Sequence, residues 1–274
     1  MVKGLTTAGV PDHTRDARCP PTLCKKHKVA GTGTTRFPDQ VLHEDFGAGS
    51  TGATAVSPDA PEIDVLRRGR WFASLPPALQ ACIAQRGVLR RFRSGQYLLR
   101  EGDPPRGMFG LVHGRTRHVC AVGEEREVLM HVGGPGLWTG EYPLLSGARS
   151  IGSVIADAPT HALYLSAIDW QRIVDEEPRW LAHFAALMAE RFATAFRAYA
   201  DAQGLTRDEW VYARLQLVAQ VEREHGSPVP QIRLSQSQLA SMVGVSRQTL
   251  NAALARLQRR GLVRVGFRMI ELVE

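Results

Sequence analysis

The sequence predicts an α+β protein that combines an antiparallel β sandwich or barrel, a long helix and a C-terminal winged helix-turn-helix. Three observations predict this fold class. Glycine-containing turns recur at short intervals through residues 88–166, which is typical of many short antiparallel strands. A stripe of apolar residues at spacings of four and three follows over residues 181–199. Near the C-terminus, two helical patterns that begin at serines flank a glycine turn.

Residues 1–62 are rich in Gly, Thr, Pro, Asp and Ala and have no sustained period of two or 3.6. We expect a disordered N-terminal extension there. Cys19 and Cys24, with His27 and His13 nearby, have the side chains that bind zinc or an iron–sulfur cluster. A structural zinc site usually has two close pairs of ligands, and no second pair follows, so we expect no metal.

Residues 63–177 form the first folded domain that we expect. Two short helices, broken at Leu75-Pro76-Pro77 with Ser74 capping the second, precede the region of short strands. Cys82 falls on an apolar helix face and is expected in the core. Cys120 lies in a strand pattern, where we expect a buried thiol.

Residues 178–204 are expected to form a long dimerisation helix, preceded by a short helix that Ser166 and Asp169 cap and that ends near Pro178. The apolar residues of the long helix fit the seam of a parallel coiled coil. The alternative is that the helix buries this stripe against its own sandwich. The predicted dimer seam is Leu181, Ala185, Met188, Phe192, Ala195 and Tyr199.

Residues 205–274 are expected to form a winged helix-turn-helix. Ser235 and Ser246 can each cap a helix, and Gly244 can take the positive φ of the turn between the two helices. Residues 262–272 alternate around a glycine, as a hairpin would. The second helix would present amide and guanidinium groups to base edges and phosphates. The candidate DNA-binding residues are Ser235, Gln238, Ser246, Arg247, Gln248, Asn251 and Arg256.

The charge of this region favours nucleic acid as the partner. Residues 231–268 contain seven arginines and neither Asp nor Glu, within a chain of formal net charge +7. A surface with cations alone attracts phosphate. The alternative is a small helical hairpin with a solvated basic face.

The order of these motifs resembles the Crp/Fnr family of transcription regulators over about residues 63–274. The resemblance rests on the glycine turns of the strand region, on Gly136-x-Trp138-x-Gly140-Glu141 with Arg149-Ser150, and on the turn around Gly244. It implies a cyclic-nucleotide-binding-like jelly roll as sensor domain. It also implies a homodimer that binds an inverted repeat in double-stranded DNA, with RNA polymerase as a further partner. The candidate effector pocket is Gly140, Glu141, Arg149 and Ser150.

The sequence departs from the family pattern at several positions. The spacing from Glu141 to Arg149 is a residue or two short, and Ala195 and Phe196 stand where cyclic-AMP-responsive members offer a Thr-Ser pair to the adenine. These departures count against a cyclic nucleotide and leave the effector unknown. Ala252 replaces a base-reading arginine of some relatives, so we expect a different half-site.

Other classes of protein fit less well. The sequence shows no nucleophile–base pair, phosphate loop or metal-ligand helix, so we expect no enzyme. It has neither an apolar run of about 18 residues nor an apolar signal segment, so we expect a cytoplasmic protein without a membrane partner. A redox- or metal-sensing regulator that uses Cys19 and Cys24 is the alternative function.

Overall fold

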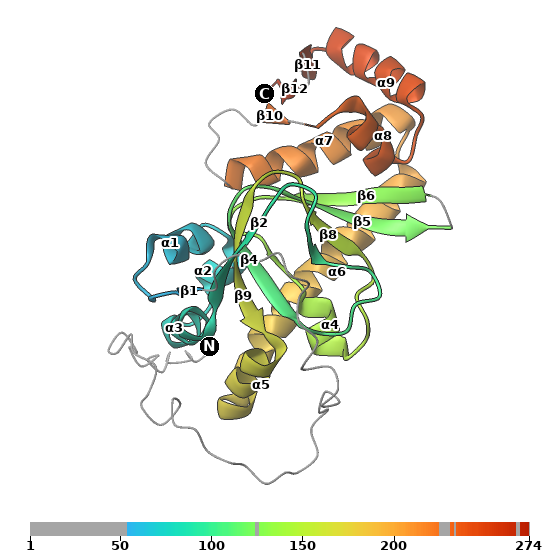
Figure 1. Ribbon diagram of the computed structural model, residues 1–274. Coiled ribbons are helices and arrows are strands. Elements are labelled where there is room, and N and C mark those ends of the chain that lie inside the picture. The colour runs from blue at the N-terminus through green and yellow to red at the C-terminus, as the bar shows by residue number, and fades with distance from the viewer. Residues whose placement is uncertain (1–53, 124–125, 225–230, 233, 267–268, 274) are drawn as a thin grey trace, which may run out of the picture.

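Two antiparallel β-sheets form the centre of the computed structural model, which describes residues 54–123, 126–224, 231–232, 234–266 and 269–273 (Figure 1). One sheet has the order β1-β2-β9-β4-β7 and the other β3-β8-β5-β6. Side chains from both sheets share one apolar cluster, so the predicted β sandwich is confirmed. The strands are β1 (Thr54–Ala55), β2 (Val88–Phe92), β3 (Tyr97–Leu99), β4 (Gly107–His113), β5 (Thr116–Val122), β6 (Arg126–Gly133), β7 (Trp138–Thr139), β8 (Ser153–Ala156) and β9 (Thr160–Ser166).

The helices before β2 differ from the prediction. Three are present where two were expected: α1 (Pro61–Arg67), α2 (Arg70–Ser74) and α3 (Pro77–Arg86). The chain breaks at Gly69, where an added Cβ would lie 2.1 Å from the Gly136 oxygen, so the two backbones meet too closely for a larger residue. Ser74 ends α2, whereas Pro76 occupies the N-cap of α3, so the prediction that Ser74 caps this helix was wrong.

Two further expectations need correction. Residues 54–62 are not disordered, because β1 pairs with β2 and α1 begins at Pro61. The first fifty-three residues lie outside the described ranges. Cys82 is fully buried, as predicted, but Cys120 is only half-buried. Its position near the end of β5, next to an exposed Ala121, explains the difference.

Helix α6 (Leu181–Gly204) runs along the sandwich and leads to the C-terminal domain (Figure 1). It follows α4 (Glu141–Ser146), α5 (Ala167–Glu176) and the 3-10 turn η2 (Pro178–Trp180). Ser166 caps α5 by accepting from the Asp169 N–H, as predicted. Phe184 and Leu187 anchor α6 in a core that also contains Trp71.

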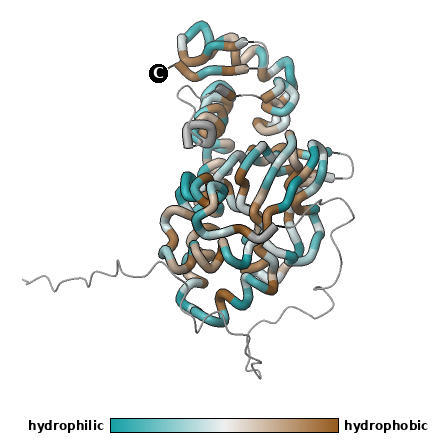
Figure 2. The backbone as a smooth tube through the Cα atoms, turned by 60° about the vertical axis from the view of Figure 1, so that its left-hand side comes forward, coloured by the Kyte–Doolittle hydropathy of each residue, from teal (hydrophilic) through white to brown (hydrophobic). Residues whose placement is uncertain are grey.

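The C-terminal domain confirms the predicted winged helix-turn-helix. It contains α7 (Arg207–Glu224), β10 (Gln231–Ile232), α8 (Gln236–Val243), α9 (Arg247–Arg259), β11 (Val263–Gly266) and β12 (Met269–Leu272). Strands β11 and β12 pair antiparallel as the wing, and β10 adds a third strand that the sequence did not predict. Figure 2 shows this domain as a unit that stands on the sandwich. None of the described helices combines the length and apolar character that crossing a bilayer requires.

Candidate nucleic-acid interface and effector cavity

Helix α8 begins with a complete capping box. The Ser235 hydroxyl accepts from the Gln238 N–H at 3.1 Å, and the Gln238 side-chain oxygen accepts from the Ser235 N–H at 2.9 Å. These two bonds satisfy backbone donors that the first helical turn leaves unpaired. Ser235 and Gln238, two of the candidate DNA-binding residues, therefore already have a structural role, and the Ser235 hydroxyl is engaged in it.

Helix α9 is held against α8 by a short turn and by an apolar face. Gly244 ends α8 with φ +74°, which only glycine adopts at little cost, and Ser246 caps α9 by accepting from the Thr249 N–H. Leu250 and Leu257 are buried against the rest of the domain. The orientation of α9 follows from these contacts.

The opposite face of α9 is open to solvent. Arg247, Gln248 and Asn251 are exposed, and they lie in the first turns after the cap. A helix that reads the major groove uses side chains near its N-terminus for base edges. The structure thus brings these three predicted residues together on one accessible surface.

Arg256 has a partner that the sequence analysis missed. Its guanidinium forms a two-pronged ion pair with Asp208 of α7, with Nε–Oδ2 at 2.6 Å and Nη2–Oδ1 at 2.7 Å. The hydrogen bond from Arg256 lowers the pKa of Asp208 below its ordinary value. A phosphate contact from Arg256 therefore requires this ion pair to open. No acidic residue lies near Arg256 in the sequence. The ion pair forms only because α7 packs on α9, so sequence patterns could not predict it.

Other arginines of the predicted basic surface remain exposed. Arg259 and Arg260 lie at the C-terminal end of α9, and Arg264 lies on β11. Arg233 and Arg268 lie outside the described residues. With Asp208 committed to Arg256, these three exposed guanidiniums and Arg247 leave the C-terminal domain with exposed positive charge that attracts phosphate.

In the sandwich, Gly140 and Glu141 begin α4. Gly140 has φ +99°, and an added Cβ would lie 2.6 Å from the Gly107 oxygen, so this position requires glycine. The Glu141 side chain is nearly buried and lies 3.8 Å from Arg191 of α6. Burial raises the pKa of the Glu141 carboxyl, although Arg191 acts in the opposite direction.

The side chains of Arg149 and Ser150 are hydrogen-bonded to backbone carbonyls and not to Glu141. The Arg149 guanidinium donates to the Gly102 carbonyl at 2.7 Å, and its side chain is exposed. The Ser150 hydroxyl donates to the Gly152 carbonyl at 2.8 Å. Both side chains stabilise the loop before β8 in this arrangement.

A cavity of about 570 Å³ lies beside Glu141, and Gly140 and Ser150 also line it, whereas Arg149 does not. The cavity is bounded by the second sheet, by α6 and by α7 and α8 of the C-terminal domain. Burial, together with the positive charge of Arg191, lowers the pKa of His118 in its wall to about 3, so this imidazole is neutral at ordinary pH.

The C-terminal domain docks on the free edge of β6, which sequence analysis did not predict. The Ser241 hydroxyl of α8 accepts from the Leu129 N–H at 3.1 Å and donates to the Glu127 carbonyl at 3.4 Å. Arg214 of α7 donates to the Met130 carbonyl at 2.8 Å. Leu129 also belongs to the apolar core of the C-terminal domain. The sheet that contains β6 and the C-terminal domain therefore form a continuous contact.

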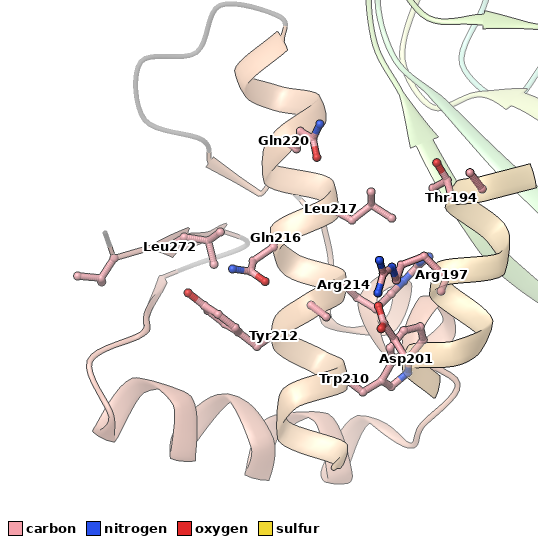
Figure 3. Close-up of a pocket in the computed structure, with 14 residues that line it drawn as sticks. Thr194, Arg197, Asp201, Trp210, Tyr212, Arg214, Gln216, Leu217, Gln220 and Leu272 are labelled. Atoms are coloured by element: carbon pink, nitrogen blue, oxygen red, sulfur yellow. The ribbon is translucent and has the colours of Figure 1, made fainter. Parts of the chain in front are cut away.

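A second cavity, of about 720 Å³, separates α6 from α7 (Figure 3). Arg197 and Asp201 of α6 face Trp210 and Arg214 of α7 across it. Arg214 lines both cavities, so its side chain stands at the junction of the sensor, the long helix and the C-terminal domain.

The predicted seam residues of α6 are mostly exposed. Phe192 and Tyr199 each keep 65% of their accessible surface, and Phe192 stacks on Phe196 at 5.9 Å between ring centroids. Phe184 and Leu187, on another side of the helix, supply the contact with the sandwich. The alternative, in which the stripe itself packs on the sandwich, is therefore wrong. Leu181, Ala185 and Ala195 are exposed as well, and Met188 is half-buried.

The residues behind the metal- or redox-sensing alternative cannot be placed together. Cys19, Cys24, His13 and His27 lie outside the described residues. Within the part of the chain that the structure describes, no three His, Cys, Asp or Glu side chains form a group that could hold a metal ion.

Two family models match the chain. One, described as a cyclic nucleotide-binding domain, matches residues 89–177, and the other, described as a Crp-like helix-turn-helix domain, matches residues 213–274. The first matched segment contains Glu141 and the sheet side of the cavity beside it, and the second contains α8, α9 and the wing. Site and family models therefore agree on where the two functional regions lie.

Individual proteins are similar over most of the chain. The cyclic AMP receptor protein of Thermus thermophilus is 28% identical over 192 residues, which cover 68% of this chain and 83% of that protein. A CRP-like cAMP-activated global transcriptional regulator of Mycobacterium tuberculosis is 22% identical over 204 residues, covering 74% and 91%. The structure of FixK2 from Bradyrhizobium japonicum has a TM-score of 0.61 and 18% identity, covering 69% of this chain and 93% of that one. This last likeness concerns the fold.

Proposed function

The chain belongs to the Crp/Fnr family of transcription regulators, and we propose that it acts as a homodimer that binds an inverted repeat in double-stranded DNA through α9. It is a DNA-binding regulator with an effector-sensing domain and not an enzyme. The observation that supports the mode of binding is the exposed group Arg247, Gln248 and Asn251 on the cationic side of α9.

In this proposal each side chain has a stated task. Arg247 forms a bidentate contact with a guanine, and Gln248 and Asn251 read neighbouring bases. Ser246, at the cap, lies close to the DNA backbone, where Gln238 contacts a phosphate through its amide NH2 while its oxygen stays in the capping box. Arg256 contributes only when it leaves Asp208.

Dimerisation through α6 determines the form of the target. The exposed apolar seam of α6, which includes Phe192 and Tyr199, fits a second copy of the same helix. A two-fold dimer presents its two reading helices about one DNA turn apart, roughly 34 Å, so each half-site has an inverted mate. RNA polymerase is the further partner that we propose for a regulator bound in this way.

The similar proteins do not identify the effector of this sensor domain. Two of them have cyclic AMP in their names, yet in this chain Arg149 is turned to the Gly102 carbonyl and Ala195 and Phe196 offer no polar group to an adenine. A cyclic nucleotide therefore fits this site poorly, and the chain needs no metal for the function proposed.

Selection of bound sequences from random DNA, followed by affinity measurements, tests the proposal. We expect a palindromic motif and a dimeric complex. Arg247→Ala should cost about 1–3 kcal/mol on the selected site and leave binding to scrambled DNA nearly unchanged. Arg259→Ala is the matched control, because this exposed arginine lies at the other end of α9, and it should weaken both kinds of DNA alike. Equal losses on both DNAs for Arg247→Ala would remove this residue from the reading role.

A further inference from the structure

The cavity beside Glu141 has a mostly apolar wall. Side chains from the second sheet, from α6 and from the C-terminal domain contribute to it, and its volume of about 570 Å³ lies within the range of sites that bind small organic molecules. Its apolar lining includes Val128, Met130, Ile151, Met188, Leu217 and Met242. Ile151 is 64% exposed and Met130 50%, so both keep apolar surface that a ligand in the cavity can cover.

One cation in this wall forms no ion pair with a carboxylate among the described residues. Arg214 is only 7% exposed, and its Nη2 donates to the Met130 carbonyl, while its guanidinium lies 5.3 Å from the Trp210 ring centroid. Its Nε is buried and has no hydrogen-bond partner. Burial lowers the pKa of Arg214, although the charge of Asp201, which faces Arg214 across the other cavity, acts in the opposite direction. A buried cation with an unused donor is costly unless an anion pairs with it.

The other charges of the wall do not meet this need. Glu141 lies next to Arg191, and burial raises the pKa of its carboxyl. His118 is neutral. The cavity therefore combines a surplus of positive charge at one place with apolar surface elsewhere.

We infer that this cavity binds an apolar organic acid, with the carboxylate on Arg214 and the hydrocarbon body among the apolar side chains of the second sheet and α6. The inference rests on the proposed effector-sensing function and names the chemical class of the effector. A cyclic nucleotide fits less well, because it brings many polar groups into a wall that offers few partners for them.

The position of Arg214 connects the ligand to DNA binding. Arg214 belongs to α7, whereas Met130 and Ile151 belong to the sensor domain and Met188 to α6. A bound acid thus contacts all three parts of the chain and stabilises the arrangement in which they meet. If DNA binding also prefers one arrangement of these parts, ligand and DNA affect each other's affinity reciprocally.

Isothermal titration of the full chain with decanoate tests the inference, with 1-decanol as the neutral match and cyclic AMP as the competing class. We expect decanoate to bind about tenfold or more tightly than 1-decanol, because a charge-assisted hydrogen bond adds to the same apolar contact. No heat with decanoate, or tighter binding of cyclic AMP that decanoate does not reverse, would overturn the inference.

Two variants test whether the carboxylate of the ligand contacts Arg214. Arg214→Gln keeps an amide donor for the Met130 carbonyl but removes the charge, so it should lose about tenfold in decanoate affinity while 1-decanol binding stays the same. Ile151→Asp, at an exposed position, should also weaken decanoate more than 1-decanol and does not depend on the folding of the first variant. Arg197→Gln, on α6 outside this cavity, is the matched control. Equal decanoate affinity in all four proteins would contradict the assignment.

Binding to the selected palindrome, measured on the same samples without ligand, separates the two proposals. Intact DNA binding without decanoate binding would refute the ligand class alone. Loss of palindrome preference would refute the proposed function instead.

Discussion

Replacing Asp208 by asparagine should make DNA binding of this regulator more sensitive to salt. In the structure the two oxygens of Asp208 hold the Arg256 guanidinium at 2.6 and 2.7 Å, and the two charges cancel. The neutral amide of the variant would leave Arg256 free to contact one phosphate. One added phosphate contact steepens the slope of log K against log salt by about 0.9, which is an additional loss of roughly eightfold in affinity per tenfold rise in salt.

Fluorescence anisotropy on the selected duplex over a series of salt concentrations measures this slope. The double variant Asp208→Asn/Arg256→Gln should return the slope to that of the wild type, and Arg256→Gln alone should change it little. The ion pair is exposed to solvent, so its loss costs little stability. The reasoning fails if Arg256→Gln alone flattens the slope by about 0.9 and Asp208→Asn has no effect, because Arg256 would then leave Asp208 whenever DNA binds.

The remaining predictions concern stability and assembly. Gly140→Ala should lower the free energy of unfolding in urea by about 2–5 kcal/mol, because the positive φ and the Gly107 oxygen at 2.6 Å both oppose a Cβ. The control Gly147→Ala, which has a positive φ but nothing within 4 Å, should cost about 1–2 kcal/mol. Equal costs would refute the steric argument. Phe192→Glu should shift the dimer to monomer in analytical ultracentrifugation, because it places a charge in the apolar seam. The control Ala186→Glu, at an exposed position outside the seam, should leave the dimer intact. A Phe192→Glu protein that stays dimeric excludes this seam. The wild type should lose about 2 kcal/mol between pH 7 and pH 5 relative to His118→Gln, because the unfolded chain binds a proton near pH 6.5 and the folded one only near pH 3. Parallel stability curves would show that His118 titrates normally.

Local signals in the sequence predicted local structure well. Ser235 and Ser246 cap their helices as expected, because a cap depends on residues within three positions. Gly244 takes the positive φ that the turn between two capped helices requires. The family resemblance then supplied the order of the domains, which local patterns alone leave open.

Interactions between distant segments were not predictable in this way. Arg256 pairs with Asp208, 48 residues earlier, and Arg214 bonds to Met130, 84 residues away. The pairing of β1 with β2 and the close approach at Gly69 likewise depend on tertiary packing. Arg149 is a further example. Its residue type and position fitted an anion site, but its guanidinium donates a hydrogen bond to the Gly102 carbonyl instead.

The docking of α8 on β6 also bears on solubility. Strand β6 is the last strand of its sheet, and its backbone groups at Leu129 and Met130 are satisfied by Ser241 and Arg214 rather than by another strand. An uncovered strand of this kind is a template for pairing with other chains. Any effector or variant that releases the C-terminal domain from β6 would open a route to aggregation, because the bonds from Ser241 and Arg214 also cover the strand edge.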